Sequence, residues 1–270
     1  MFGRRILILA PHPDDEVVGA GAAIARARAA GANVAVLFLT TGVPARELLW
    51  PWSRGGLPAW VARRRAEAGT AADCLGFEIA GFLDFPTRTL RLNLCAARAA
   101  AVAALKRHRA DRLWLPAWEG GHQDHDAANV LAATLIDREL PGSAVWEFSE
   151  YNFRGGQVRT QEFPFPSADE VALALSVEEQ GSKRRALALY ASERGNLGYV
   201  SAGREVFRPL ASYDYARPAH DGLLFYQRFQ WVPFRHPRVD FTHPKQVCRD
   251  LIRWHQQGQG QGQRRGSASP

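Results

Sequence analysis

The chain has 270 residues and a formal net charge of +7, with 46% hydrophobic and 23% charged residues. This composition excludes an intrinsically disordered chain, and the length is typical of one large α/β domain, which we expect over residues 1–255. The three cysteines are too widely spaced to indicate disulfides or a thiolate metal site, and the apolar runs are too short for a membrane span or a signal peptide, so we expect a cytoplasmic protein.

The first predicted element is a buried strand over residues 6–10, an apolar run that ends at a proline. The alanine-rich segment 17–29 predicts the helix that follows, with Pro13 at the first helical position. The turn between them, residues 11–16, has the sequence PHPDDE. Acids near a helix N-terminus are favoured by the macrodipole, so one interpretation is that they only cap the helix. That interpretation does not account for a histidine followed so closely by three acids.

The other interpretation of this turn is a metal site. His12 and Asp15 lie three positions apart, one at the strand end and the other in the first helical turn, so their side chains can converge on one point. Imidazole nitrogen and carboxylate oxygen are both good Zn²⁺ ligands, and a catalytic zinc usually has three protein ligands and a water. The third ligand must therefore come from elsewhere in the chain.

A second strand is predicted over residues 33–40, and a long connection, residues 41–60, follows it. This connection contains three tryptophans, three prolines and three glycines. Long connections in compact domains often carry function, and tryptophan faces stack well on sugar rings. The sequence leaves two alternatives open, a lid or sugar-binding platform and a packed cover over the core.

Further strands alternate with helical stretches later in the chain. Such alternation implies right-handed crossovers and a mainly parallel sheet, so we predict an α/β protein with a three-layer Rossmann-like fold. The sequence lacks a Gly-x-Gly-x-x-Gly turn and a Gly-x-Ser-x-Gly elbow, which excludes NAD binding and a serine hydrolase. The predicted strands are residues 79–83, 113–115 and 145–148.

A second acidic turn lies between the strand at 113–115 and a predicted helix at 127–139, and it contains His122, Asp124 and His125. Ligands of open α/β sheets bind at the carboxyl ends of parallel strands, so we expect both acidic turns to face one crevice. His125 can then complete the zinc site. His122 and Asp124 remain as catalytic groups or as groups that orient an imidazole. Taken alone, this segment is equally compatible with a solvated polar loop.

The C-terminal part of the chain has a different composition. Residues 207–250 are dense in aromatics, prolines and arginines, which predicts a small β-rich extension over the sheet, within an aromatic-rich C-terminal extension of the domain over residues 200–255. Residues 256–270, repetitive in glutamine and glycine, predict a disordered tail. Arginines occur along the whole chain without a nucleic-acid-binding motif, so we expect no nucleic-acid partner, although some arginines can guide an anionic substrate.

Residues 11–16 together with residues 122–125 (HQDH) resemble the LmbE/PIG-L family of zinc-dependent N-deacetylases. The first motif matches completely. The second departs at Gln123, where the family commonly has proline, and keeps its chemically active side chains. Weaker similarity occurs at residues 63–76, an arginine-rich helix ending in Leu-Gly, and at residues 183–192, a lysine-to-tyrosine helix.

The resemblance implies a zinc enzyme, with Fe²⁺ as an alternative metal, that removes the acetyl group from an N-acetylated amino sugar or glycoconjugate. The sugar is free or linked to a nucleotide or a lipid. His12, Asp15 and His125 are the implied metal ligands. Two other functions remain open, hydrolysis of another amide such as an acylated metabolite or an amino-acid conjugate, and a non-catalytic basic protein that binds carbohydrate or nucleic acid.

The resemblance also implies roles for the remaining polar residues. Asp14 is the implied general base that takes a proton from the metal-bound water as it attacks the acetamide carbonyl. His122 is expected to stabilise the oxyanion or to protonate the leaving amine, with Asp124 hydrogen-bonded to it or to a neighbouring group. Glu16 receives no role, and the sequence does not indicate an oligomeric state.

Overall fold

A seven-stranded sheet forms the centre of the protein, which is described here by a computed structural model over residues 1–266, with the side chains of residues 1–256. The strand order is β3-β2-β1-β4-β5-β9-β8, and the first five strands of this order are parallel. At the β5 edge, β9 pairs antiparallel with β5, and β8 pairs antiparallel with β9. The strands are β1 (Arg5–Ala10), β2 (Asn33–Phe38), β3 (Glu78–Phe82), β4 (Arg112–Pro116), β5 (Val145–Phe148), β8 (Val171–Ala174) and β9 (Arg204–Pro209). A separate ribbon pairs β6 (Tyr151–Asn152) with β7 (Arg159–Thr160).

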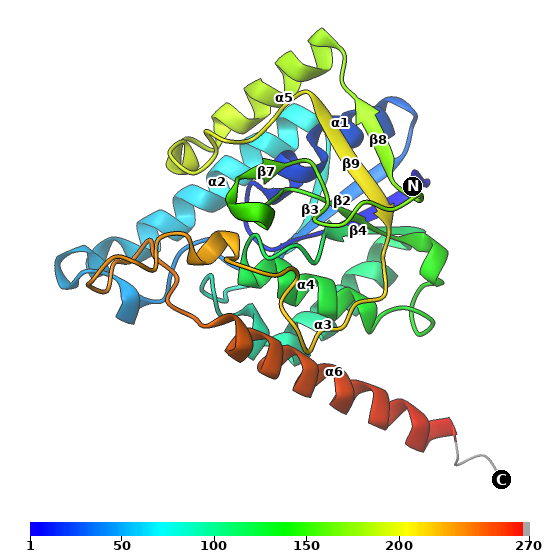
Figure 1. Cartoon of the computed structure of the whole chain (residues 1–270). Coiled ribbons are helices and arrows are strands. Elements are labelled where there is room, and N and C mark those ends of the chain that lie inside the picture. Colours follow the sequence, from blue (N-terminus) through cyan, green and yellow to red (C-terminus); the bar gives the residue numbers. More distant parts are fainter. Residues whose placement is uncertain (267–270) are drawn as a thin grey trace.

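Helices cover both faces of the sheet (Figure 1). One layer contains α1 (Asp15–Ala29), α2 (Leu57–Leu75) and α5 (Val177–Leu189), and the other contains α3 (Leu94–His108), α4 (Gln123–Ala133) and α6 (Pro244–Gly266). Successive residues of β1 alternate between the two hydrophobic cores, with Ile6 and Ile8 in one and Leu7 and Leu9 in the other. A strand that is buried on both faces has a continuous apolar sequence, which explains the apolar run at residues 6–10. The three-layer Rossmann-like fold is confirmed.

The predicted strands are confirmed within one or two residues at each end, but two helix boundaries differ. α1 begins at Asp15, so Pro13 is not its first residue as we expected. The reason is Asp14, which turns the chain with a φ of 141° before the helix starts. α4 covers residues 123–133 rather than 127–139. It begins earlier than predicted because His122 caps the helix by accepting a hydrogen bond from Asp124 N–H.

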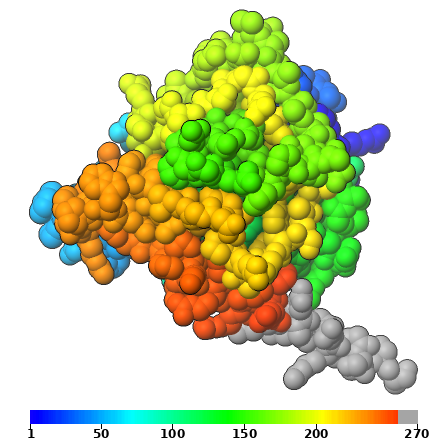
Figure 2. Space-filling view, in the orientation of Figure 1, coloured from blue at the N-terminus to red at the C-terminus, as the bar shows by residue number. Residues whose placement is uncertain are grey.

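The prediction of a β-rich extension over residues 207–250 is wrong. In the described residues 210–243 there is no strand, and one 3₁₀ turn, Phe225–Gln227, lies in an otherwise irregular path. Several prolines in this segment lack the N–H that a sheet ladder requires. We call residues 223–242 the strap. Figure 2 shows its orange surface across the face of the molecule seen there.

The C-terminal tail also differs from the expectation. α6 continues to Gly266, so residues 256–266 are helical where we expected disorder, and residues 267–270 lie outside the described residues. Glutamine and arginine are good helix formers, whereas the four glycines of this segment oppose a helix. Within the described residues, no helix is long and apolar enough to cross a bilayer.

A buried ion pair fastens the second half of the chain to α1. Lys183 Nζ lies 2.7 Å from Glu205 Oε1 and donates to Val18 O. The Glu205 carboxylate also accepts hydrogen bonds from Ala22 N and Ala23 N, each at 2.8 Å. A buried charge pair needs such additional hydrogen bonds to offset its desolvation. α5 and β9 thereby fix the helix whose first turn carries Asp15.

Candidate active site

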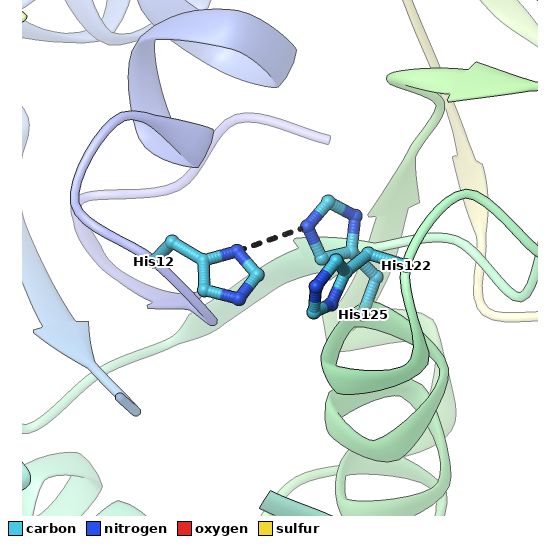
Figure 3. A group of neighbouring side chains, drawn as sticks. All are labelled: His12, His122 and His125. Carbon is cyan, nitrogen blue, oxygen red and sulfur yellow. Dashed lines mark hydrogen bonds between the residues drawn. The ribbon is translucent and has the colours of Figure 1, made fainter. Parts of the chain in front are cut away.

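The two acidic turns meet at the carboxyl ends of β1 and β4, which are neighbours in the parallel sheet. From β1 the chain continues to strands on one side, and from β4 to a strand on the other, so this is the point where the strand order reverses. Ligands bind at such switch points in open α/β sheets. Figure 3 shows His12 from the first turn facing His122 and His125 at the start of α4. The structure thus brings the two predicted turns together at one edge of the sheet.

Two ring nitrogens and the two oxygens of one carboxylate converge on one point. His12 Nδ1 lies 3.1 Å from Asp15 Oδ2, and His125 Nε2 lies 3.3 Å from both Asp15 Oδ1 and His12 Nδ1. Tetrahedral zinc with bonds of about 2.0–2.1 Å places neighbouring ligand atoms about 3.3 Å apart. Two imidazoles and a carboxylate are also a donor set found in catalytic zinc sites. These residues therefore fit a divalent metal ion.

His122 also belongs to this cluster. Ring nitrogens of His12, His122 and His125 lie within 4.8 Å of one another. The His122 Nδ1 atom accepts the hydrogen bond from Asp124 N–H at 3.1 Å, so its Nε2 atom carries the proton in the neutral ring. Burial and the charge of His12 hold the pKa of His122 well below its usual value. The ring is therefore a neutral hydrogen-bond donor.

The Asp124 carboxylate orients His12. Its Oδ2 atom lies 3.1 Å from His12 Nε2, while Leu90 N–H donates to Oδ1. Thr87 Oγ1 also contacts His12 Nε2, at 2.9 Å. Burial alone would raise the pKa of Asp124, but the hydrogen bonds from His12 and from Arg88 N–H outweigh burial and lower the pKa. An ionised Asp124 fixes the proton on His12 Nε2 and leaves Nδ1 free to bind a metal.

Asp14 is held by groups whose roles the sequence did not indicate. Its carboxylate lies 3.3 Å from Arg64 Nη2, and its N–H donates to Glu16 Oε2 at 3.1 Å. Tyr190 from the end of α5 donates to the other Glu16 oxygen. A positive φ is costly for a residue with a side chain, so these contacts stabilise a strained turn. Burial raises the pKa of Asp14 well above its usual value, and the Arg64 charge opposes that shift.

Glu150 is a further acidic residue at the site that the sequence reasoning missed. It is 1% exposed, and its Oε2 atom lies 4.0 Å from His125 Nδ1. Neither atom has a hydrogen-bond partner among the side chains that the structure describes. Burial and the charge of Asp15 raise the pKa of Glu150 well above its usual value. Its position just after β5, at the same sheet edge, was the signal that could have identified it.

Comparison with known proteins identifies similar sequences and folds. Residues 7–136 match the family model described as PIG-L: GlcNAc-PI de-N-acetylase. The matched residues make up just under half of the chain, and this part is similar to the PIG-L family. Both acidic turns lie inside the PIG-L match, whereas Glu150, Tyr190 and the strap lie outside it.

Similar proteins include a curated enzyme and solved structures with the same fold. The chain is 37% identical over 86 residues to the 1D-myo-inositol 2-acetamido-2-deoxy-alpha-D-glucopyranoside deacetylase of Kineococcus radiotolerans, a match that covers 32% of this chain and 24% of that relative. The chain therefore spans about a quarter of the relative's length. A deacetylase of the teicoplanin biosynthesis pathway has 19% identity and a TM-score of 0.61, with 78% of this chain and 99% of that chain covered.

A second solved structure, the A40926 pseudoaglycone deacetylase, has 20% identity and a TM-score of 0.58, again with 78% of this chain and 99% of that chain covered. At this level of identity the structural similarity supports the fold alone. The fold shared with these two solved structures thus extends through most of the described chain.

Proposed function

We propose that this protein is a divalent-metal-dependent N-deacetylase that hydrolyses the acetamide of an amino sugar derivative. The observation that carries the proposal is the convergence of His12 Nδ1, Asp15 and His125 Nε2 within 3.1–3.3 Å of one another. Asp14, with a carboxylate outside that triad, stands beside it. The PIG-L match and the acetamido-sugar substrate named for the curated relative support the assignment. We propose that the substrate is an N-acetyl sugar, either free or linked to a nucleotide or a lipid. We expect the protein to act in the cytoplasm.

His12, Asp15 and His125 would hold the metal, and the His122 ring lies next to that of His12, with ring centroids 4.5 Å apart. Zn²⁺, or Fe²⁺ as the alternative, supplies Lewis-acid activation of water and of the acetyl carbonyl when it is bound. The protein's own contribution is to fix the ligand geometry before binding. Asp124 does so for His12, and Glu150 is placed to do so for His125 by accepting a hydrogen bond from Nδ1–H.

Asp14 acts as the general base in this proposal. It takes a proton from the attacking water and later delivers that proton to the leaving nitrogen, because an amide nitrogen leaves poorly unless it is protonated. The raised pKa of Asp14, caused by burial, favours this return of the proton. Arg64, at 3.3 Å, directs the carboxylate and moderates the shift.

His122 stabilises the negative charge that develops on the acetyl oxygen. A neutral ring with the proton on Nε2 donates a hydrogen bond to that oxygen, and pre-oriented donors of this kind contribute strongly to acyl-transfer reactions. Of the two roles implied for His122 by the family resemblance, the hydrogen bond that Nδ1 accepts from Asp124 N–H favours oxyanion stabilisation, because it leaves the proton on Nε2 to be donated.

The test is acetate release from a panel of N-acetylhexosamine derivatives, free and linked to nucleotides or lipids. The protein is stripped of metal with a chelator and then reconstituted with zinc or ferrous iron. Metal-dependent release from one class supports the proposal. Amine release only from acylated metabolites or amino-acid conjugates would show that the protein hydrolyses another class of amide. If the reconstituted protein releases nothing from any compound, the proposal that it is an amide hydrolase is rejected.

A further inference from the structure

Gln123, the residue at which the second motif departs from the family pattern, connects three parts of the chain. Its side chain is fully buried, and its Nε2 atom donates to Asp240 Oδ2 at 2.6 Å and to Thr242 Oγ1 at 3.0 Å. Its Oε1 atom accepts from Arg91 Nη1 at 2.6 Å. Both ends of the amide are therefore engaged, and a proline could make none of these bonds.

The backbone at this position is compatible with either residue. Gln123 is the first residue of α4, where proline is favoured because an N–H at that position has no acceptor within the helix. His122 has φ −144° and ψ 142°, the extended conformation that the residue before a proline must adopt. The side chain, rather than the path of the turn, is what the glutamine adds.

Asp240 and Thr242 belong to the strap, and other contacts hold the strap on the same side of the molecule. Phe225 N–H donates to Gly120 O at 3.0 Å, just before the second acidic turn. Arg88 Nη1 donates to Val239 O at 3.1 Å, whereas the bond from Gln230 Nε2 to Asp240 O, at 2.7 Å, lies within the strap itself. The strap is thus attached by individual hydrogen bonds and not by sheet pairing.

The strap also reaches the surroundings of the metal ligands. The Tyr151 ring packs against His125, with ring centroids 5.5 Å apart, and against Phe225 of the strap, with centroids 4.5 Å apart. The Cβ that any other residue would add at Gly120 would lie 2.8 Å from Leu224 Cδ2, so the strap approaches this turn closely. One aromatic ring separates the strap from His125.

The outer surface of the strap is rich in exposed rings. Trp231 is 77% exposed and Phe234 is 57% exposed. His236 lies edge-on to Trp50 of the long connection after β2, with centroids 5.9 Å apart, and Trp50 stacks on the exposed Trp52. These rings offer flat apolar faces of the kind that bind sugar rings and aromatic groups.

We propose that Gln123 is a positioning residue that holds the strap beside the active site, and that the strap selects substrates by the group attached to the amino sugar. The selection step rests on the proposed deacetylase function, whereas the attachment of the strap does not. Because the amide bonds Asp240 directly, loss of the side chain removes the donor to Oδ2 of a buried carboxylate. Oδ1 keeps only the Thr242 N–H, which belongs to the strap itself, so this end of the strap is freed.

The attachment is tested by hydrogen–deuterium exchange on metal-loaded protein, for wild type, Gln123→Pro, Gln123→Ala and Gln161→Ala. Gln161 is a matched control, since it is also a fully buried glutamine and donates to Val18 O, away from the strap. Amides of the strap should exchange at least tenfold faster in both Gln123 variants and at the wild-type rate in the control, with bound zinc unchanged. Wild-type exchange in Gln123→Ala would overturn the attachment.

The selection is tested by the kinetics of acetate release from N-acetylglucosamine and from its 4-methylumbelliferyl β-glycoside. In Gln123→Pro, KM for the glycoside should rise at least fivefold with kcat unchanged, while both constants for the free sugar stay at the wild-type values. Equal changes for both compounds would overturn the selection. If wild type releases acetate from neither compound and from no member of the panel, the deacetylase proposal fails and the selection with it, while the exchange data still decide the attachment.

Discussion

His12 Nε2 and Asp124 Oδ2 lie 3.1 Å apart, although 112 positions separate the two residues in the chain. This contact couples the two acidic turns before any metal binds. Replacement of Asp124 with Asn leaves the His12 ring free to change its protonated nitrogen, so zinc affinity should fall about 10–100-fold. Competition with a chromophoric chelator measures the affinity. Thr87→Val, which removes the weaker partner of the same nitrogen, should lower it less.

Asp14→Asn removes the proposed base without removing a proposed ligand. We expect turnover to fall about 10²–10⁴-fold, the usual contribution of a positioned general base, while zinc content stays at the wild-type level. Acetate release and metal analysis of the same preparation measure both quantities. Full activity in this variant would exclude Asp14 as the base.

The two histidines of α4 should separate metal binding from catalysis. His125→Ala removes a ligand of the converging triad and should lower the bound zinc well below that of wild type. His122→Ala should retain the metal and lose about 10²–10³-fold in kcat, as expected when a donor to the oxyanion is removed. Metal analysis of both variants decides the ligand set. Equal zinc loss in the two would place His122 among the ligands.

Glu150 should influence metal affinity through His125. Glu150→Ala removes the acceptor that faces Nδ1 at 4.0 Å, and zinc should then bind about 10–100-fold more weakly. Glu150→Gln keeps an acceptor oxygen in the same place and should restore most of the affinity. Titration with a competing chelator distinguishes the three proteins. The role is contradicted when the alanine variant binds zinc as tightly as wild type.

Stability should depend on pH through Glu119, whose pKa burial raises from the usual 4.5 to about 8. Between these pH values the folded protein keeps a proton that the unfolded chain releases, so the free energy of unfolding decreases as pH rises through this window, by up to about 1.4 kcal/mol per pH unit. Urea unfolding of metal-free protein at several pH values measures the slope. Glu119→Gln cannot titrate and should show a shallower decrease, and an identical slope in the two proteins would reject the assignment.

The sheet and the proposed metal ligands could be predicted from the sequence because both depend on local patterns. The apolar run at residues 6–10 is buried on both faces, and each acidic turn follows such a strand directly. Parallel strands bring their carboxyl ends to one edge, so topology alone placed the two turns together. The first helix boundary was missed by two residues because Asp14 adopts a backbone conformation that no sequence pattern signals.

The contributions of the second half of the chain could not be predicted, because each depends on a distant partner. Glu16 received no role from the sequence, since its partner Tyr190 is 174 positions away. The aromatic density at residues 207–250 indicated strands, whereas the path of the strap is set by the bonds of Gln123 to Asp240 and Thr242. In the sequence, Gln123 could be recognised only as a residue that replaces the family's usual proline and leaves the chemically active side chains in place.

The attachment of the strap by single side-chain bonds rather than by a strand has an evolutionary consequence. A strand inserted in the sheet constrains its neighbours, because a shift of one residue reverses which side chains face the core. The strap carries no such constraint, since no strand is present in the described residues 210–243. Its sequence can therefore diverge, lengthen or shorten without shifting the register of the strands that position the two acidic turns.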